Sequence, residues 1–467
     1  MNKLPLSLTL SVVTLAGCTM IPSYHRPAAP VASDWPAGQV YGKVDRNGSA
    51  ADIAWRSFFT DPQLRKLIEA SLQNNRDLRV AALNVELARD QYRIQRSALY
   101  PTVGPSASGS RGRTAAGVNG TTEAALGNQY NANYASAAYE VDLFGKLRSL
   151  TRQQQEKYLA SAEARTSVQI SLIGQVAIGY LTLREIDEQL GVARQTLAAV
   201  QDSYQLNKRS FEAGTASELD LSTADAQVQT AQVHLLEYER QSALAVNELT
   251  LLVGEPLPAD LPRGKTLPAQ AVLANLPAGL PSGLLLRRPD ILESEHILKA
   301  ANADIGAARA AFFPTISLTS SVGASSLQLS KLFSTPAATW AFAPQISVPI
   351  FDGGKNLAGL DAAQVSKRIE VATYEKAIQT AFREVADALA GKASYEKQVG
   401  AQEALVAAES KRYTLANARY RQGVDNYLNV LSAQQDLYSA QQALIQSRFA
   451  RLSSLITLYK ALGGGWK

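Results

Sequence analysis

The side chains able to bind a metal or to carry out acid–base chemistry are few in this sequence. One stretch reads Glu293-Ser-Glu-His296, and the Glu-x-x-His spacing occurs at carboxylate metal sites in helical bundles. His234 has no glutamate three residues before it, so the second half of such a site is missing, and we interpret the stretch as a solvated helix face. One cysteine and three histidines in 467 residues allow neither a disulfide framework nor a Cys/His zinc site. We therefore expect no metal, no cofactor and no enzymatic activity.

The single cysteine, Cys18, is placed where a thiol can be acylated. It follows Met1-Asn2-Lys3 and an apolar stretch from Leu4 to Ala16, which together have the form of a secretory signal over residues 1–17. The sequence Leu15-Ala-Gly-Cys18 resembles the bacterial lipobox, in which the cysteine becomes the lipid-modified N-terminus; a plain signal peptide containing a cysteine is the alternative. Thr19 follows the cysteine, so the aspartate that retains lipoproteins at the inner membrane is absent, and export to the outer membrane is predicted.

Proline placement predicts two very long helices. No proline lies between Pro105 and Pro256 or after Pro349, although proline costs about 3 kcal/mol in a helix interior. Apolar residues recur every seven positions in both tracts, as in a coiled coil. The first series is Val176, Leu183, Leu190, Leu197 and Tyr204, and the second is Val371, Ile378, Val385, Val399, Val406 and Tyr413, interrupted at Lys392. Net charge is 46 − 41 = +5 with the basic residues scattered, which gives no support for nucleic-acid binding.

The two series coincide at an offset of 209 residues, which indicates an internal duplication. Leu219 matches Leu428 at this offset, and Gly214 matches Gly423. We predict a signal peptide (1–17), an N-terminal segment beginning at the lipidated cysteine (18–60), a first repeat (61–254), a Pro-rich connector (255–287) and a second repeat (288–467). The first repeat comprises a hairpin (101–144), a long helix (about 145–213) and a return helix (about 217–253). The second comprises a hairpin (314–351), a long helix (about 355–422) and a return helix (about 426–461). At 1.5 Å per residue each long helix reaches roughly 100 Å.

The hairpins have the alternation of strands that cross a membrane. Apolar Val141, Leu143, Ile346 and Val348 alternate with polar positions such as Glu140 and Gln345, which predicts one lipid-facing and one lumen-facing side. A half-buried hairpin in a soluble sheet is the alternative. The lipobox, and the lack of a stretch we interpret as a helical span, favour the membrane. Since four strands cannot close a barrel, for which roughly eight are needed, membrane insertion requires an oligomer.

Several motifs together resemble the TolC-type outer-membrane factors, most closely the OprM-like efflux lipoproteins. The matching stretches are Ile21–Pro27, Trp55–Leu64, Asn75–Arg79, Tyr139–Gly145, Arg287–Asp290, Gly306–Pro314 and Gly423–Leu428. The resemblance implies a fold that is mainly α with a transmembrane β portion. Three copies would form a homotrimer with a twelve-stranded outer-membrane β-barrel continuous with a long periplasmic α-helical barrel, and residues 18–60 and 255–287 would lie in its equatorial region.

The resemblance also implies a function. The chain would be the exit duct of a tripartite pump for drugs and other toxic compounds. Its partners would be a periplasmic adaptor protein and an inner-membrane resistance-nodulation-division (RND) transporter. The chain would be anchored in outer-membrane lipid by acyl groups such as palmitate, and would contribute to antibiotic resistance. Alternatives are a conduit for type I protein secretion or metal-ion efflux, and a lipid-anchored periplasmic coiled-coil scaffold.

The resemblance places a gate at the periplasmic tip of the channel. Gly214 and Gly423 would form the tip turns that contact the partners, and Leu428 matches a leucine of the constriction. Relatives carry an acidic residue one turn later, but here that position is Ser432. Asp436, or Asp220 and Asp225 in the first repeat, could supply the carboxylate, with a solvated helix face as the alternative for each. We predict that closure depends on the leucine more than on charge.

Overall fold

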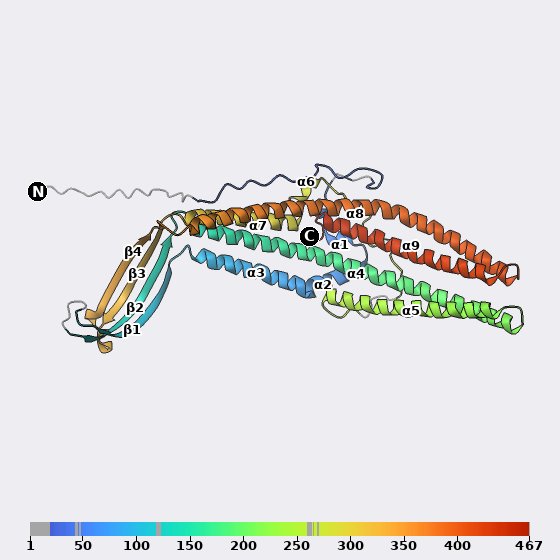
Figure 1. Ribbon diagram of the computed structural model, residues 1–467, viewed down its shortest axis with the longest axis horizontal. Helices are drawn as coiled ribbons and strands as arrows, with labels where there is room; N and C mark the ends of the chain where they lie inside the picture. The colour runs from blue at the N-terminus through green and yellow to red at the C-terminus, as the bar shows by residue number, and fades with distance from the viewer. Residues whose placement is uncertain are drawn as a thin grey trace. The chain divides into compact units, whose positions relative to one another are not determined.

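The computed structural model describes residues 19–42, 45, 48–117, 123–258, 264, 266–268 and 270–466. The predicted signal peptide and Cys18 lie outside the described residues. Short helices come first: η1 (Ala50–Asp52), α1 (Trp55–Phe58) and α2 (Pro62–Asn74). The first repeat continues with α3 (Arg76–Ser97), β1 (Thr102–Thr114), β2 (Ala125–Val141), α4 (Lys146–Glu212) and α5 (Glu218–Val253). After α6 (Pro281–Leu284), the second repeat has α7 (Pro289–Ala310), β3 (Thr315–Ser326), η2 (Leu329–Lys331), η3 (Thr335–Ala337), β4 (Ala338–Ser347), α8 (Lys355–Arg421) and α9 (Tyr427–Ala461) (Figure 1).

The element lengths show how closely the two repeats match. Helices α4 and α8 have 67 residues each, and they begin 355 − 146 = 209 residues apart. The same offset, 427 − 218, separates the starts of α5 and α9, whereas β1 and β3 start 315 − 102 = 213 residues apart. The four-residue difference therefore lies between the start of the hairpin and the start of the long helix.

The chain forms two compact units that do not coincide with the repeats. Of the described residues, the strand unit contains 19–27 and those within Val85–Ser161 and Ser294–Tyr374, and the helix unit contains those within Ala28–Asn84, Ala162–Glu293 and 375–466. Helices α3, α4, α7 and α8 each begin in one unit and continue in the other. Each unit therefore takes part of its structure from both copies of the repeat.

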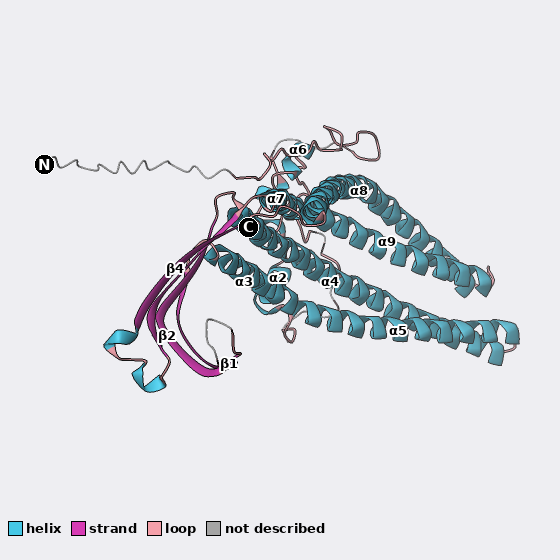
Figure 2. Ribbon diagram, turned by 60° about the vertical axis from the view of Figure 1, so that its left-hand side comes forward, coloured by secondary structure: helices cyan, strands magenta, loops and turns pink. Residues whose placement is uncertain are grey.

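In the strand unit, the described strands form one curved antiparallel sheet in the order β1-β2-β3-β4 (Figure 2). Phe144, which follows β2, stacks on Phe313, which precedes β3, with ring centroids 4.6 Å apart. The outer edges of the sheet, on β1 and β4, have no partner strand among the described residues. The predicted class, mainly helical with a smaller β portion, is confirmed.

The core of the helix unit is built around the N-terminal short helices. Phe58 stacks on Tyr459 of α9 at 3.9 Å between ring centroids, and the Tyr459 hydroxyl donates a 2.5 Å hydrogen bond to the Ile53 carbonyl. Asp61 caps α2 by accepting hydrogen bonds from the Gln63 and Leu64 amides, and Pro62 occupies the first turn, where a missing N–H costs nothing. Burial of these aromatic rings fixes the short helices against the ends of the long ones.

Among the described residues, one helix is long and apolar enough to be considered as a membrane span, which the sequence analysis does not predict. Helix α4 contains an 18-residue window whose composition meets this criterion, and half of that window is buried inside the protein. Such burial is typical of a core helix, so the window is weak evidence for a transmembrane helix.

Candidate functional site

The strand pairing separates the sheet into two chemically different faces. Val141, Ile316 and Ile346 are cross-strand neighbours, and the adjacent row on the other side of the sheet is Glu140, Ser317 and Gln345. The face that carries the first row continues, along the same strands, through Tyr139, Leu318, Phe342 and Trp340; we call it the apolar face. Val141 and Ile346 thus lie on the side opposite Glu140 and Gln345, as predicted, whereas Leu143 and Val348 lie just beyond the ends of β2 and β4 and are not placed by the pairing.

The opposite side, which we call the hydroxyl face, carries a ladder of polar contacts. Asn133 donates to the Ser106 hydroxyl at 3.1 Å, and Asn131 donates to Ser108 at 3.5 Å. Ser325 in turn donates to Asn131 at 2.8 Å, which links three strands. Hydroxyl and amide groups of this kind suit a surface in contact with water, whereas the apolar face suits contact with lipid.

Glycines form the turns between the long helices and their return helices. Gly214 and Gly423 have φ values of +75° and +73°, in the left-handed region that favours glycine. Backbone bonds from Thr215 to the Ser210 carbonyl and from Val424 to the Arg419 carbonyl close the two turns in the same way. The predicted tip turns are therefore equivalent, although nothing in their geometry identifies a partner.

Two of the predicted gate residues of α9, Ser432 and Asp436, share one arginine. Arg412 of α8 donates to Asp436 at 2.7 Å and to Ser432 at 3.1 Å, and it also pairs with Glu409 at 3.1 Å. These hydrogen bonds, first from Asp436 and then from Glu409, raise the pKa of the Arg412 guanidinium. Leu428, two turns before Asp436, is 64% exposed. The Asp436 carboxylate is thus neutralised within the chain, while the leucine side chain has no such partner.

The predicted gate residues of α5 have local roles in that helix. Asp220 completes a capping box with Ser217, in which the Ser217 hydroxyl accepts from the Asp220 amide and the carboxylate accepts from the Ser217 amide. Asp225 accepts a 3.4 Å hydrogen bond from Gln229 one turn later. Within the described part of the chain, neither aspartate is hydrogen-bonded to Ser432 or Asp436.

The sequence interpretation missed two residues near this tip. No sequence pattern joins Arg412 to the gate, since Ser432 and Asp436 are 20 and 24 residues away on another helix. Tyr420 donates to the Asn207 side chain at 2.9 Å and so joins α8 to α4. It could have been found, because the seven-residue spacing that includes Tyr413 continues to Tyr420 and Tyr427.

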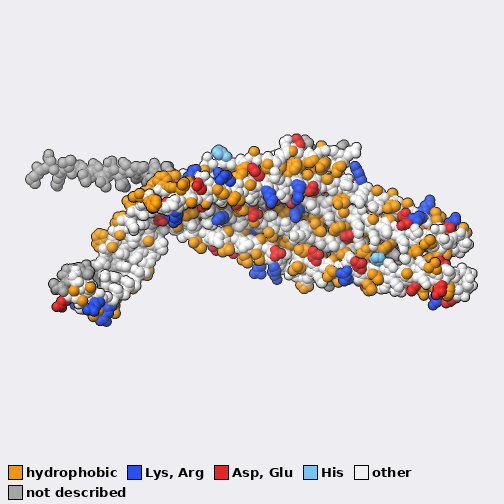
Figure 3. Space-filling model, viewed as in Figure 1, with side chains coloured by type: hydrophobic (Ala, Val, Ile, Leu, Met, Phe, Trp, Pro, Cys, Tyr) orange, Lys and Arg blue, Asp and Glu red, His pale blue; other side chains and the backbone are white. Residues whose placement is uncertain are grey.

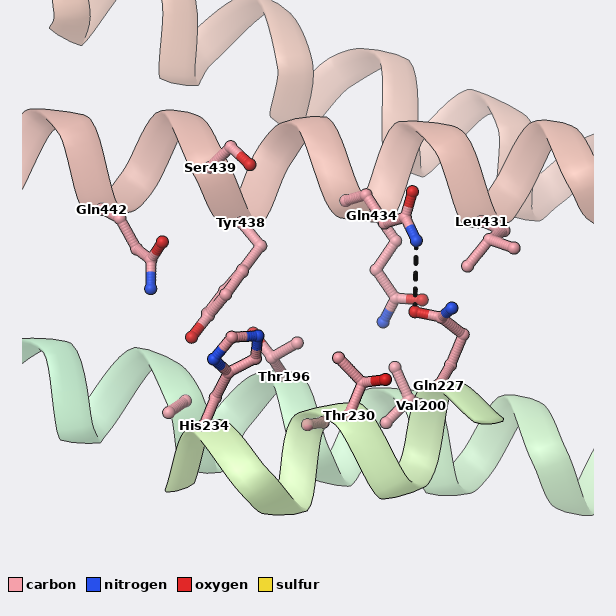
Figure 4. Close-up of a pocket in the computed structure, with 13 residues that line it drawn as sticks. Thr196, Val200, Gln227, Thr230, His234, Leu431, Gln434, Tyr438, Ser439 and Gln442 are labelled. Atoms are coloured by element: carbon pink, nitrogen blue, oxygen red, sulfur yellow. Dashed lines mark hydrogen bonds between the residues drawn. The ribbon is translucent and has the colours of Figure 1, made fainter. Parts of the chain in front are cut away.

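A cavity of about 420 Å³ lies between α4, α5 and α9, and its lining on α9 runs from Leu431 to Gln442 (Figure 4). Across the cavity, Gln435 of α9 donates a 3.2 Å hydrogen bond to Gln227 of α5. The ring centroids of His234 and Tyr438 are 5.8 Å apart. The side chains that reach into the cavity are mostly amides and hydroxyls. Such a lining can hydrate the interface between the return helices.

In the strand unit, the residues after the predicted lipidation site are clamped onto α7. Glu295, with a side chain only 3% exposed, accepts two hydrogen bonds from Arg26, at 2.7 and 3.0 Å, and one from the Tyr24 hydroxyl at 3.2 Å. Lys299 also pairs with Glu295 at 3.1 Å. Burial raises the Glu295 pKa, but the bonds from Arg26 and Lys299 outweigh it, so the pKa lies below its usual range.

The neighbouring His296 belongs to a second pair, with the buried Glu156. Its Nδ1 lies 2.6 Å from Glu156 of α4, which Arg152 also contacts at 2.6 Å. The prediction that this stretch is a solvated helix face is wrong for Glu295 and His296, because α7 turns both toward other segments of the unit. Among the residues that the structure describes, no group of three His, Cys, Asp or Glu side chains is arranged to hold a metal ion.

Comparisons with known proteins agree with this geometry. Residues 67–255 and 280–464 match the family model described as outer membrane efflux protein. The chain is 50% identical over its full length to a probable efflux pump outer membrane protein, TtgC, of Pseudomonas putida, covering 96% of that protein. It is 42% identical over 98% of its length to outer membrane protein OprJ of Pseudomonas aeruginosa, covering 95% of that protein. The crystal structure of the open state of the Neisseria gonorrhoeae MtrE outer membrane channel is similar, with a TM-score of 0.85, 38% identity, and 96% and 99% of the two chains covered. The chain therefore belongs to the outer membrane efflux protein family.

Proposed function

We propose that this protein is the outer-membrane exit duct of a tripartite RND-type efflux pump. It acts as a passive conduit and not as an enzyme. The observation that supports this most directly is the sheet, with an apolar face, a hydroxyl face and two edges that no other strand of the described residues pairs with. A sheet of this kind forms one sector of a channel wall whose outside meets lipid and whose inside meets water.

The open edges explain why the duct requires more than one copy. Unpaired backbone groups cannot remain in hydrocarbon, so β1 of one chain must pair with β4 of the next. Three copies of the four-stranded sheet give twelve strands, enough to close a barrel. We propose that the homotrimer stands in the outer membrane, and that its long helices extend into the periplasm to meet an adaptor protein and an RND transporter.

Relatives indicate the class of compound carried. Names of similar proteins from Pseudomonas putida describe outer membrane proteins of toluene, solvent and antibiotic efflux pumps. We propose that this chain likewise passes drugs and other toxic compounds to the exterior. Acylated Cys18 would anchor the N-terminal segment (18–60) in the membrane, and the clamp of Arg26 on Glu295 would hold the segment's first residues against α7.

The gate is proposed at the periplasmic tip, with Leu428 as its main closing residue. Three copies of an exposed leucine around an axis exclude hydrated solutes by dewetting. Asp436 is a weaker candidate because Arg412 of the same chain already neutralises it. Ser432 contributes a hydroxyl to the same contact and no charge, and Asp220 and Asp225 are engaged within α5.

Single-channel recording in planar bilayers tests both the duct and the gate. The purified trimer should form channels with a low resting conductance, and Leu428→Ser should raise that conductance several-fold. Asp436→Asn should change it little. Leu219→Ser is the matched control, because Leu219 occupies the equivalent position of the first repeat and is 75% exposed.

Two outcomes would contradict the proposal in different ways. Protein that needs no detergent and forms no channel would be a periplasmic scaffold. If the Leu428→Ser channel conducts like the parent while the Asp436→Asn channel has a raised conductance, the channel is closed by charged groups and not by the leucine.

A further inference from the structure

The loop end of the sheet carries a small group of basic residues. The two hairpins contain three lysines and arginines, namely Arg111, Arg113 and Lys331. All three side chains are exposed, and none forms an ion pair with a described residue. Figure 3 shows Lys and Arg side chains gathered at this end of the strands. These three cations are therefore available to bind an anionic group outside the chain.

Strand register places both arginines on the apolar face. Val103 pairs with Ala137, which lies two residues from Tyr139 on that face. The irregularity between Gly104 and Ser106 falls on β2, because β1 advances two residues there while β2 advances three. Alternation along β1 is therefore unbroken, and Arg111 and Arg113 project from the same side as Val103. The polar contacts of Ser106 and Ser108 with β2 confirm that the even-numbered positions carry the hydroxyl face.

The distance along β1 sets the height of the arginines. Arg111 lies eight residues beyond Val103, which is roughly 27 Å along a strand and about 20 Å along the axis of a barrel with tilted strands. An apolar band in such barrels is about 25 Å tall. Arg111 and Arg113 thus lie at the outer boundary of the band, on the side that faces lipid.

The loop between β3 and β4 adds to the same boundary. Leu332 and Ala337 are buried against Ala324 on the apolar face, with Tyr130 packed beside them. The loop therefore folds onto the apolar face, and it leaves Leu329 61% exposed and Phe333 74% exposed beside Lys331. Exposed apolar side chains next to a cation are typical of a segment in a membrane interface.

We infer that Arg111 and Arg113, with Lys331, form a binding site for a phosphorylated glycolipid of the outer leaflet. The inference rests on the proposed membrane insertion of the strands. Acyl chains would lie against the apolar face, including Trp340 and Phe342, and the lipid phosphates would accept hydrogen bonds from the two guanidinium groups. Arginine suits this role because its planar group binds phosphate in a bidentate way. Phosphorylated lipid is favoured over an anionic protein because the charges stand directly above an apolar surface on the same face.

The test measures lipid binding to the full-length trimer by native mass spectrometry. Bisphosphorylated lipid A and its dephosphorylated form are titrated separately. The wild-type trimer should bind the phosphorylated form roughly tenfold more tightly. Arg111→Gln/Arg113→Gln should remove most of this preference, and Arg111→Lys/Arg113→Lys should keep a large part of it.

Arg76→Gln/Arg79→Gln is the matched control, since these arginines are also exposed and lie on α3, outside the sheet. It should keep the full preference. An unchanged preference in the Arg111/Arg113 glutamine variant, or equal wild-type affinity for both lipids, would overturn the inference. Channel formation is measured on the same samples: a chain that conducts but shows no preference overturns only the lipid site, whereas one that forms no channel overturns the proposed function as well.

Discussion

Replacing Glu295 by glutamine should release the N-terminal segment from α7. Glu295 is the acceptor for both Arg26 bonds and for the Tyr24 hydroxyl, and its side chain is 3% exposed. Glutamine keeps the size and one carbonyl oxygen but removes the charge. The remaining contacts of the segment are fewer, among them a bond from Asn302 to the Pro22 carbonyl at 2.8 Å.

The size of the effect follows from the geometry. Hydrogen bonds to charged groups contribute about 1.5–3 kcal/mol each. The Arg26 side chain is 39% exposed, so water screens its side of the pair, and we reduce the sum for the two bonds to about 2 kcal/mol. That free energy corresponds to an opening equilibrium about 30-fold larger.

Hydrogen exchange of the peptide covering residues 19–27 measures this opening, because amide exchange reports local unfolding. Exchange in the Glu295→Gln trimer should be about 30-fold faster. Glu293→Gln, the same change two residues earlier on α7, should leave it unchanged. Equal exchange in the parent and Glu295→Gln proteins would refute the clamp.

The acid dependence of the clamp has a definite sign. The pKa of Glu295 is lower in the folded chain than in the unfolded chain. The clamp is therefore at full strength at a pH above the unfolded-state pKa, and it weakens as the pH falls through the folded-state pKa. Intrinsic-rate-corrected exchange of residues 19–27 in the wild type should therefore be flat at neutral pH and rise only in acid. A rise near neutral pH would contradict this assignment.

Three further predictions concern other parts of the chain. Ile346→Arg should destabilise the inserted sheet by about 2–4 kcal/mol, measured by refolding into lipid, whereas Gln345→Arg on the hydroxyl face should be tolerated; the reverse would mean that the faces are assigned wrongly. Gly254→Ala should lower the heat stability of the trimer strongly, because a Cβ there would lie 2.5 Å from a backbone carbonyl oxygen at a φ of +81°, while Gly214→Ala, with open space around it, should cost only about 1 kcal/mol. Cys18→Ser should abolish the lipid mass on the mature chain but leave channel conductance intact, and an unmodified wild-type cysteine in mass spectrometry would count against acylation.

The elements that could be predicted from sequence are those with a periodic signal. Seven-residue spacing and the absence of proline predicted α4 and α8, and left-handed glycines end both, because a long helix repeats its pattern many times. Alternation along the strands predicted the faces of the sheet for the same reason.

Contacts between distant segments could not be predicted. Arg26 and Glu295 are 269 residues apart, and no local pattern joins them. The same stretch of α7 was interpreted as solvated because charged residues usually are, and only the fold shows that Glu295 and His296 are turned toward the N-terminal segment and α4. The Arg412 contact to Asp436 depends on the axial register between α8 and α9. The seven-residue pattern does not determine this register, because the apolar stripe is unchanged when one helix slides along the other by a whole repeat.

The equal length of α4 and α8 constrains how this protein can change over time. One inserted residue in either helix would rotate the rest of that helix by about 100° and shift it by 1.5 Å along the axis. Its apolar side chains would then no longer pack against the neighbouring helices, while those of the other long helix would stay in place. A compensating insertion would be needed at the same point of the other repeat. The hairpins face no such requirement, and their four-residue difference shows that the two copies have diverged in length there. Natural variation in chain length should therefore concentrate in the membrane loops, while the helices keep a shared length.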